Sequence, residues 1–230
     1  MSQANREAEA VLPASSADPL LRVSEIFLSL QGEAREVGWP TVFVRLTGCP
    51  LRCVWCDTAY AFTGGERLAV GAILERVASY GVARVCVTGG EPLAQKETLG
   101  LLRRLADRGF QVSLETSGAL PVEAVDPRVA RVVDLKPPGS GEAARNRYEN
   151  LASLGLGDQV KFVISNREDY EWARAAVERH GLTGRAEVLF SPVTGRLAAR
   201  DLAEWILADR LPVRFQIQLH QVLWGGEPGR

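Results

Sequence analysis

Residues 49–58 read CPLRCVWCDT and hold three of the four cysteines in the chain. Cys49, Cys53 and Cys56 follow a C-x₃-C-x₂-C spacing, and the aromatic Trp55 precedes the last thiol. A structural zinc site takes four protein ligands, and a 4Fe–4S cluster normally takes four thiolates. Three thiolates leave one iron of such a cluster open, and an open iron can bind and activate another molecule. The stretch therefore predicts a metal centre that is one protein ligand short.

Two other interpretations of these thiols stay open on spacing alone. A disulfide with one spare thiol would be strained at such short spacings, and nothing in the sequence indicates secretion. A zinc site completed by His180 or His220 fits the spacing as well as an open cluster does. The remaining cysteine, Cys86, lies inside an apolar run, so we expect it to be a small buried core residue.

The composition predicts an ordinary soluble globular protein. The chain has 230 residues and a mass of 25.0 kDa, with 46% hydrophobic and 24% charged residues. A formal net charge of -1 provides no bulk electrostatic attraction for nucleic acid. No apolar run approaches the roughly 20 residues that span a bilayer, and the N-terminal residues lack a signal-peptide pattern. Because free thiols persist in a reducing compartment, we expect a cytoplasmic protein without membrane or nucleic-acid partners.

Strands and helices are predicted to alternate along the chain, which is typical of βα units around a mostly parallel sheet. The expected strands are 23–30, 41–47, 83–88, 111–115, 131–135, 160–164, 187–190 and 214–219. The expected helices are 70–80, 94–108, 143–154, 168–180 and 197–208. About six such units are too few for a closed eight-stranded barrel, so an α/β fold with a partial barrel or strongly curved open sheet is expected.

This organisation predicts a single core domain over residues 21–224. Residues 1–20 are rich in Ala, Ser, Glu and Pro without a periodic apolar face, and we expect a flexible leader there. Residues 225–230 are expected to form a C-terminal tail.

Polar or glycine-rich groups follow the predicted strands at their carboxyl ends, where open α/β sheets bind ligands. The groups are Gln31, Gly32 and Glu33; the cysteine stretch; 88–92, which reads TGGEP; 115–118, which reads ETSG; 134–138, which reads DLKPP; and His220. A Gly-Gly-Glu-Pro run taken singly is usually a turn into a helix. Six such groups converging on one edge predict a binding site.

The pair Gly89 and Gly90 has a specific physical interpretation. Without a Cβ atom, these residues let a ligand approach the backbone closely. Carbonyl groups at a strand end lack ladder partners and can accept hydrogen bonds from an amino acid's ammonium group. Lys136 or Arg45 can pair with the carboxylate of the same ligand. If that amino acid is the methionine part of S-adenosylmethionine, its amine and carboxylate can chelate the open iron.

Together these motifs resemble those of the radical S-adenosylmethionine (SAM) superfamily, and within it the family of 7-carboxy-7-deazaguanine synthases. The superfamily resemblance lies in the cysteine motif and the Gly-Gly-Glu-Pro strand end. The family resemblance extends from about residue 23 to residue 224. Its segments are 25–33, 43–49, 55–58, 134–141 and 216–220.

The resemblance implies a lyase that breaks a carbon–nitrogen bond with a radical. A 4Fe–4S cluster on Cys49, Cys53 and Cys56 would bind SAM at its fourth iron. One electron would cleave SAM to a 5′-deoxyadenosyl radical, which takes hydrogen from C6 of 6-carboxy-5,6,7,8-tetrahydropterin. The ring would then contract, recover hydrogen and lose ammonia, which gives 7-carboxy-7-deazaguanine, a precursor of queuosine-type bases.

The resemblance also implies roles for single residues. Substrate contacts are implied for Leu30, Gln31, Gly32, Glu33, Arg45, Thr88 and His220. SAM contacts are implied for Gly89, Gly90, Glu91, Glu115, Ser117, Asp134, Leu135 and Lys136. Thr58 would bind Mg²⁺ together with substrate oxygens, because this ion uses few protein ligands. A homodimer and a flavodoxin-like or ferredoxin-like electron donor are implied as partners.

Simpler explanations exist for several of these residues. Arg45 and Glu33 can pair with each other, and Thr58 can cap a turn. His180 stands beside a glycine at a predicted helix end, where a cation suits the helix dipole. His220 can be a satisfied residue at the end of the last strand.

Two departures from the family pattern affect these expectations. Asp134 and Leu135 stand where some relatives carry Ser-Pro, so contacts to SAM there can come from the backbone. The tail 225–230 extends beyond the last strand, which puts in doubt any contact between a C-terminal carboxylate and the pterin.

Two other functions remain as alternatives. A radical SAM activase, which takes hydrogen from a glycine of a partner protein, would share the thiols and the Gly-Gly-Glu-Pro run. It would have no need of the Gln-Gly-Glu and Cys-Asp-Thr motifs of a pterin site. A non-catalytic zinc-binding interaction module would be colourless and would not respond to a reductant.

Overall fold

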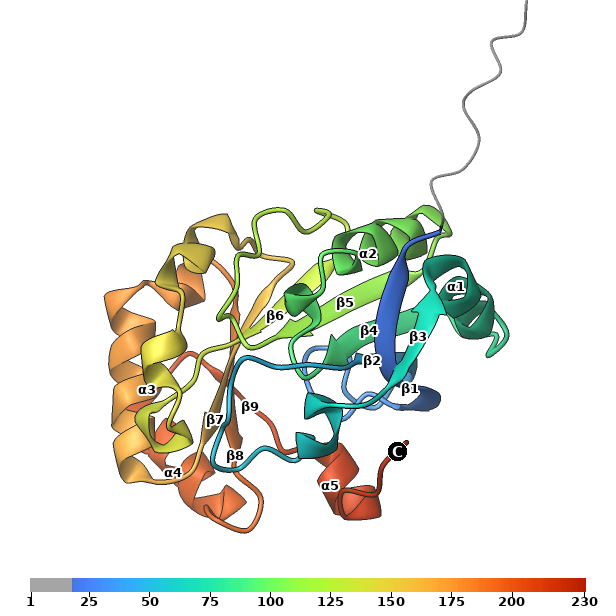
Figure 1. Cartoon of the computed structure of the whole chain (residues 1–230). Helices are drawn as coiled ribbons and strands as arrows, with labels where there is room; N and C mark the ends of the chain where they lie inside the picture. The colour runs from blue at the N-terminus through green and yellow to red at the C-terminus, as the bar shows by residue number, and fades with distance from the viewer. Residues whose placement is uncertain (1–17) are drawn as a thin grey trace, which may run out of the picture.

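The computed structural model describes residues 18–230, which form one nine-stranded sheet with helices packed against it (Figure 1). The strand order is β3-β1-β2-β4-β5-β6-β7-β8-β9. Strand β1 (Leu20–Leu30) runs antiparallel to both β2 (Pro40–Leu46) and β3 (Glu66–Ala69). All pairs from β2 to β9 are parallel. These strands are β4 (Arg84–Gly89), β5 (Gln111–Thr116), β6 (Ala130–Asp134), β7 (Gln159–Ile164), β8 (Glu187–Pro192) and β9 (Arg214–Phe215).

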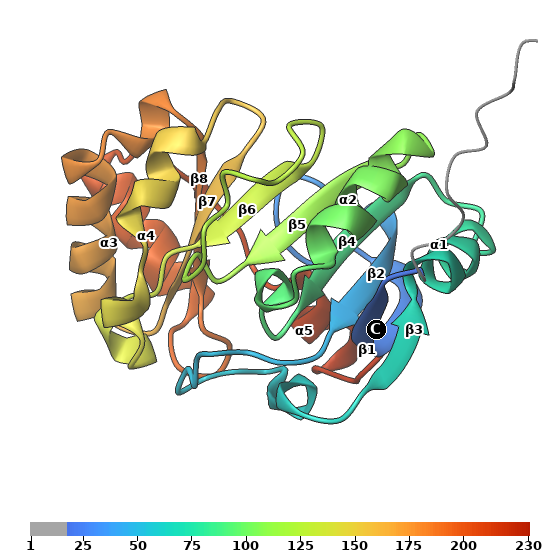
Figure 2. The ribbon, with the colours of Figure 1, turned by 45° about the horizontal axis from the view of Figure 1, so that its top comes forward.

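The predicted α/β fold with a mostly parallel, curved sheet is confirmed. Parallel strands are buried on both faces because the crossover helices cover them, so their sequences are mostly apolar rather than strictly alternating. All six residues of β7 are buried. The sheet twists strongly along its length and does not close into a barrel (Figure 2).

Four helices cover the outer face of the sheet: α1 (Val70–Ala78), α2 (Thr98–Asp107), α3 (Arg167–Arg179) and α4 (Ala199–Asp209). Helix α1 turns Ile73, Leu74 and Val77 into the core, and all three are fully buried. Helix α3 begins at Asn166, whose side chain accepts a hydrogen bond from the Asp169 amide at 2.9 Å. Helices α1 and α2 lie beside one half of the sheet, and α3 and α4 lie beside the other half (Figure 2).

The helix predicted over residues 143–154 is wrong. Two short 3₁₀ turns, Ala143–Arg145 and Tyr148–Ser153, replace it. Asn146 lies between the turns and bonds the backbone of Lys136 in both directions, with N–O distances of 2.8 Å. Because this side chain ties the segment to the end of β6, the segment does not extend into a regular helix.

The strand predicted over residues 214–219 is also wrong for most of its length. Strand β9 holds only two residues, and the short helix α5 (Leu219–Trp224) begins where the prediction ends. The Leu219 amide donates to the Gly32 carbonyl at 2.9 Å, which draws the chain away from the sheet. His220 therefore lies in a helix rather than at the end of a strand.

Other boundaries differ less from the sequence predictions. Strand β3 was not predicted because its residues, ERLA, alternate charge without an aromatic or β-branched residue. The helix predicted over 94–108 begins at Thr98, after a 3₁₀ turn at Pro92–Ala94. Most of the predicted leader, residues 1–17, lies outside the described residues, and β1 begins at Leu20. Within residues 18–230, no helix combines the length and the apolar character needed to cross a membrane.

Candidate active site

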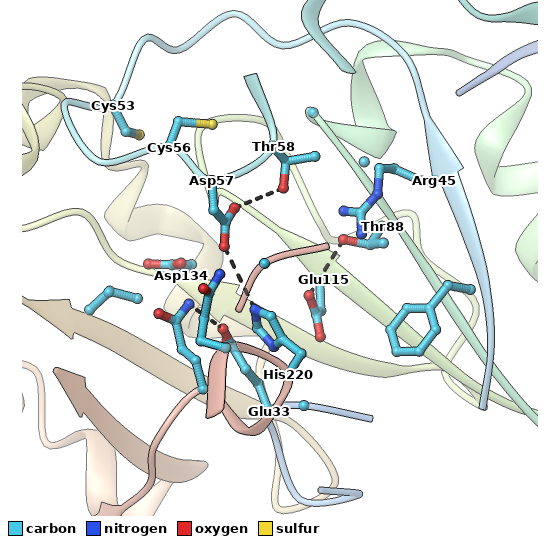
Figure 3. A pocket seen from close by; sticks show the side chains of 18 of the residues that line it. Glu33, Arg45, Cys53, Cys56, Asp57, Thr58, Thr88, Glu115, Asp134 and His220 are labelled. Carbon is cyan, nitrogen blue, oxygen red and sulfur yellow. Dashed lines mark hydrogen bonds and ion pairs between the residues drawn. The ribbon is translucent and has the colours of Figure 1, made fainter. Parts of the chain in front are cut away.

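One cavity at the carboxyl ends of the parallel strands brings together residues from most strand ends (Figure 3). The cysteine loop after β2 borders it, as does the segment 30–33 at the end of β1. The ends of β4, β5 and β6, strand β7 and helix α5 supply further lining residues. The tail also reaches the cavity, since residues 226–230 line it. Residues separated by almost the whole chain length therefore share one site.

Backbone contacts fix the cysteine loop over this cavity. Gly48, with a φ of 100°, turns the chain out of β2, and its amide donates to the Ala61 carbonyl at 2.8 Å. The Val54 amide donates to the Ser140 carbonyl at 3.0 Å, which joins the loop to the segment after β6. Cys49, Cys53 and Cys56 are partly buried and all line the cavity.

The three thiols share similar electrostatic surroundings. Burial raises the pKa of each thiol, and the Lys136 ammonium acts in the opposite direction on all three. Across residues 18–230, no three His, Cys, Asp or Glu side chains converge closely enough to hold one metal ion.

The two glycines at the end of β4 are required by the packing of the chain. A Cβ atom on Gly89 would lie 2.3 Å from the Leu46 carbonyl oxygen, and one on Gly90 would lie 2.4 Å from that of Gly48. The Gly90 amide donates to the Leu46 carbonyl at 3.0 Å. Close approach of two backbones therefore explains these glycines, in addition to the ligand approach that the sequence suggested.

Glu91 ties the ends of β4 and β5 together. Its buried carboxylate accepts hydrogen bonds from the Thr116 hydroxyl at 2.9 Å and from the Ser117 amide at 2.8 Å. The Leu93 amide donates to it at 2.9 Å. With these donors in place, the Glu91 carboxylate is occupied by protein and does not border the cavity.

Lys161 joins two carboxylates that approach it from different strand ends. Its ammonium donates to Glu33 Oε2 and lies 3.6 Å from Asp134 Oδ2. Lys136 Nζ lies 3.0 Å from the same Asp134 oxygen, and Gln218 Nε2 donates to Glu33 Oε1 at 2.8 Å. Burial alone would raise the pKa of Glu33, but the Lys161 charge outweighs burial and lowers that pKa below its ordinary value. Glu33 is therefore a carboxylate at neutral pH.

Arg45 pairs with Glu25 rather than with Glu33. Arg45 Nε donates to Glu25 Oε1 at 2.7 Å, and the Tyr60 hydroxyl donates to the same oxygen at 2.7 Å. The guanidinium lies over the Phe27 and Tyr60 rings, 5.8 and 5.9 Å from their centroids. The simpler alternative, an ion pair between Arg45 and Glu33, is therefore wrong. Arg45 lines the cavity, and Glu25 holds its guanidinium from one side.

His220 reaches the cavity from α5 and faces the cysteine loop. His220 Nε2 lies 3.8 Å from Asp57 Oδ2, and Thr58 donates its hydroxyl proton to Asp57 Oδ1 at 2.7 Å (Figure 3). A Cβ atom on Gly32 would lie 2.2 Å from His220 Nδ1, so the ring rests directly on this glycine. Burial lowers the pKa of His220, but the nearby carboxylates, with Asp57 the nearest, outweigh burial and raise it above its ordinary value.

Glu115 is a partly buried carboxylate of the cavity. It accepts hydrogen bonds from Gln31 Nε2 at 3.3 Å and from the Thr88 hydroxyl at 3.4 Å. Burial raises its pKa above the ordinary value, and the neighbouring Glu33 charge acts in the same direction. The carboxyl group of Glu115 therefore stays protonated up to a higher pH than that of an exposed glutamate.

Comparisons with known proteins agree with this geometry. A family model described as the Radical SAM superfamily matches residues 43–137. A 7-carboxy-7-deazaguanine synthase of Chlorobaculum tepidum is 46% identical over 213 residues, which cover 91% of this chain and 96% of that relative. One from Koribacter versatilis is 41% identical over 224 residues, which cover 90% of this chain and 98% of that relative. The chain belongs to the 7-carboxy-7-deazaguanine synthase family.

A solved structure supports the fold assignment. The crystal structure of QueE from Escherichia coli matches with a TM-score of 0.71 and covers 87% of this chain and 95% of that chain. The two sequences are 24% identical, so this likeness speaks for the fold alone. As a 7-carboxy-7-deazaguanine synthase family member, the chain is a radical SAM enzyme whose cofactors are a 4Fe–4S cluster and SAM. The family match favours a synthase over the activase kept as an alternative.

Most residues that the sequence suggested for the site border the cavity. They are Leu30, Gln31, Gly32, Glu33, Arg45, Cys49, Cys53, Cys56, Thr58, Thr88, Gly89, Gly90, Glu115, Ser117, Asp134, Lys136 and His220. Glu91 and Leu135 do not border it, because Glu91 is bonded to β5 and the Leu135 side chain is fully buried in the core. Cys86 is fully buried, as expected of a core residue.

Sequence reasoning missed several lining residues of the cavity, and four of them take part in its polar network. They are Asp57, Tyr60, Lys161 and Gln218. A signal existed for Lys161, because a single lysine inside the apolar strand VKFVI needs a buried partner. Asp57 and Gln218 stood within motifs that we quoted for the resemblance without giving them roles. Tyr60 carried no signal in the sequence.

Proposed function

We propose that this chain converts 6-carboxy-5,6,7,8-tetrahydropterin into 7-carboxy-7-deazaguanine with loss of ammonia, in the synthesis of queuosine-type bases. The observation that carries the proposal is one cavity bordered by both the cysteine loop and the segment 30–33. The resemblance assigns these two segments to the cofactor and to the pterin. The name of the relatives from Chlorobaculum tepidum and Koribacter versatilis agrees with this product.

The residues on the cofactor side fit a cluster with SAM. We assign the cluster to Cys49, Cys53 and Cys56, whose thiols line the cavity. Asp134 Oδ1 is buried without a hydrogen-bond donor in residues 18–230, so it suits the amino group of an amino acid. The Lys136 ammonium beside it suits a carboxylate. When bound and reduced by one electron, SAM would provide the 5′-deoxyadenosyl radical that takes a hydrogen atom from the substrate.

Several SAM contacts in this proposal differ in kind. Gly89, Gly90, Glu115 and Ser117 border the cavity and can meet the ligand directly. Glu91 contributes by holding Ser117 in place through its carboxylate. Leu135 contributes only indirectly, because its amide donates to the Lys161 carbonyl at 2.9 Å and its side chain is in the core.

The residues on the substrate side fit a flat, hydrogen-bonding ring with one carboxylate. Arg45 Nε donates to Glu25. No described residue accepts a hydrogen bond from the two terminal guanidinium nitrogens, which can therefore bind a substrate carboxylate. Glu33, Glu115 and Thr88 present oxygen atoms for the N–H groups of the pterin. Gln31, Gly32 and His220 close this side, together with Leu30.

Thr58 has a geometry suited to a magnesium ligand. Its hydroxyl donates its proton to Asp57, which leaves the oxygen lone pairs for a cation. Mg²⁺ typically combines one or two protein oxygens with water and substrate oxygens. The substrate carboxylate held by Arg45 would supply negative charge that balances the charge of Mg²⁺.

The wider organisation belongs to the same proposal. Residues 21–224 would act as one radical SAM domain in the cytoplasm, as part of a homodimer. Residues 225–230 would be a tail that borders the pocket. A flavodoxin-like or ferredoxin-like protein would deliver the electron.

Turnover by the reconstituted protein tests the proposal. The chain is loaded with iron and sulfide without oxygen and mixed with SAM, dithionite, Mg²⁺ and the carboxypterin. Mass spectrometry should detect 7-carboxy-7-deazaguanine and an equal amount of ammonia, with slower turnover when Mg²⁺ is chelated. A protein that binds a 4Fe–4S cluster and cleaves SAM but forms no deazapurine would overturn the assignment.

A further inference from the structure

Lys161 contacts carboxylates from both halves of the cavity. We define the substrate half as residues 30–33 with α5, and the cofactor half as residues 134–136. Glu33 belongs to the first half and Asp134 to the second, and the Lys161 ammonium reaches both. Lys161 lies in β7, opposite Asp134 of β6 in the strand register. Its side chain is 9% exposed.

The two carboxylates differ in how far the protein satisfies them. Both oxygens of Glu33 have a donor, from Lys161 and from Gln218. Asp134 directs Oδ2 toward Lys161 and Lys136, whereas Oδ1 is buried and has no donor in the described part of the chain. The Lys161 ammonium is therefore shared between Glu33, whose two oxygens both accept hydrogen bonds, and Asp134, which has one oxygen without a donor.

We propose that Lys161 is a positioning residue that couples the two ligands, so that SAM and the carboxypterin each strengthen the binding of the other. This inference rests on the proposed function, because it takes the two halves as the sites of these two ligands. The amino group of SAM would donate a hydrogen bond to Asp134 Oδ1. Its positive charge would weaken the electrostatic attraction between Asp134 and Lys161. Lys161 would then hold Glu33 more firmly in the orientation that accepts the N–H groups of the pterin.

The physical basis is the arrangement of charge in a poorly hydrated site. A cation between two carboxylates responds to a charge added beside either one, and this response is stronger where water is scarce. A ligand can shift such an equilibrium only by the difference in its interaction with the two arrangements. The effect must also be reciprocal, since a coupling free energy between two sites is the same in both directions.

Calorimetry on the reconstituted holoenzyme, without oxygen and without a reductant, measures this coupling while no turnover occurs. The dissociation constant of 6-carboxy-5,6,7,8-tetrahydropterin is determined with and without saturating SAM. We expect binding on the order of 10-fold tighter with SAM. The affinity for SAM should rise by the same factor when the pterin is present.

In Lys161→Met, the dissociation constant of each ligand should be about the same with and without the other ligand. The pterin should also bind more weakly than to wild type, whether or not SAM is present. Because this variant leaves two carboxylates facing each other, the double variant Lys161→Met/Glu33→Gln removes the excess charge and protects the fold. It should also show no coupling. Arg131→Met is the matched control, since Arg131 pairs with Asp158 at 2.6 Å, is similarly enclosed and lies outside the cavity. This control should keep the full 10-fold ratio.

Wild-type enzyme whose two affinities are independent would overturn the inference, as would a Lys161→Met/Glu33→Gln double variant that keeps the coupling. Loss of coupling in Arg131→Met would show a general loss of rigidity and would equally contradict the role of Lys161. These outcomes differ from failure of the proposed function, in which the carboxypterin is neither bound nor turned over. An enzyme that makes the product without coupling between ligands leaves the function intact and removes only the inference.

Discussion

Two clusters of ion pairs in this molecule each combine two cations with two carboxylates, but in different surroundings. The pocket cluster consists of Glu33, Asp134, Lys136 and Lys161, whose side chains are 9% to 17% exposed. The helix cluster consists of Arg167, Glu171, Arg174 and Asp209 on α3 and α4, whose side chains are 24% to 50% exposed. Exposed pairs contribute little to stability, whereas buried charges are costly unless each has a partner. The comparison agrees with the proposed role of the pocket cluster in binding ligands.

The largest expected effect concerns the thiols beside the pocket cluster. Cys53→Ala should abolish formation of 5′-deoxyadenosine and of product, because two thiolates cannot hold the cluster in an active form. The melting temperature of the metal-free protein should change little, since Cys53 lies on a loop. Assays without oxygen and thermal unfolding measure the two quantities.

Cys86→Ala is the matched control for this prediction. Cys86 is fully buried in β4, away from the cluster loop, so turnover should persist. The variant should lose about 1 kcal/mol of stability through the small cavity left behind. A Cys53→Ala protein that still forms 5′-deoxyadenosine would contradict the role given to the loop.

The next effect compares the two clusters directly. Lys161→Met should lower the free energy of unfolding by about 3 kcal/mol, because it leaves Glu33 buried without its cation. Arg174→Met, in the helix cluster, should cost about 0–1 kcal/mol because water replaces its partners. Urea unfolding of both variants gives the two values. Equal losses would show that the clusters do not differ as described.

Gly32→Ala tests the contact between the end of β1 and α5. The added methyl group would collide with the His220 ring, so His220 should move and kcat/KM should fall about 10- to 100-fold. Gly100→Ala is the control, because a Cβ atom at this exposed position of α2 meets nothing within 4 Å. It should leave kcat/KM unchanged and slightly raise stability. Normal kinetics in Gly32→Ala would mean that His220 has no part in the site.

The smallest effect is a pH dependence of stability. Because the folded-state pKa of His220 is raised above its ordinary value of 6.5, its stabilising contribution is complete below pH 6.5. That contribution disappears as pH rises through the folded-state pKa. His220→Gln should therefore lose stability relative to wild type at pH 6, and the difference should narrow toward pH 9. A difference that widens as pH rises would mean that the carboxylates around His220 do not stabilise its charge.

The fold and much of the cavity could be predicted because they depend on patterns local in the sequence. A short apolar run marks strands such as β7, and the cysteine spacing marks the loop after β2. The failures have tertiary causes. Asn146 replaces a predicted helix by bonding the backbone after β6, and Gly32 ends a predicted strand early by bonding Leu219. Lys161 was missed because its partners come from 27 and 128 residues earlier in the chain.

The most direct test of the account follows a single hydrogen atom. The holoenzyme is supplied with 6-carboxy-5,6,7,8-tetrahydropterin that carries deuterium at C6, and the adenosyl products are analysed by mass spectrometry. If the 5′-deoxyadenosyl radical takes hydrogen from C6, deuterium should appear in 5′-deoxyadenosine and in recovered SAM, and 7-carboxy-7-deazaguanine should form. Product formation without any deuterium in the adenosyl group would contradict hydrogen abstraction from C6 at this site.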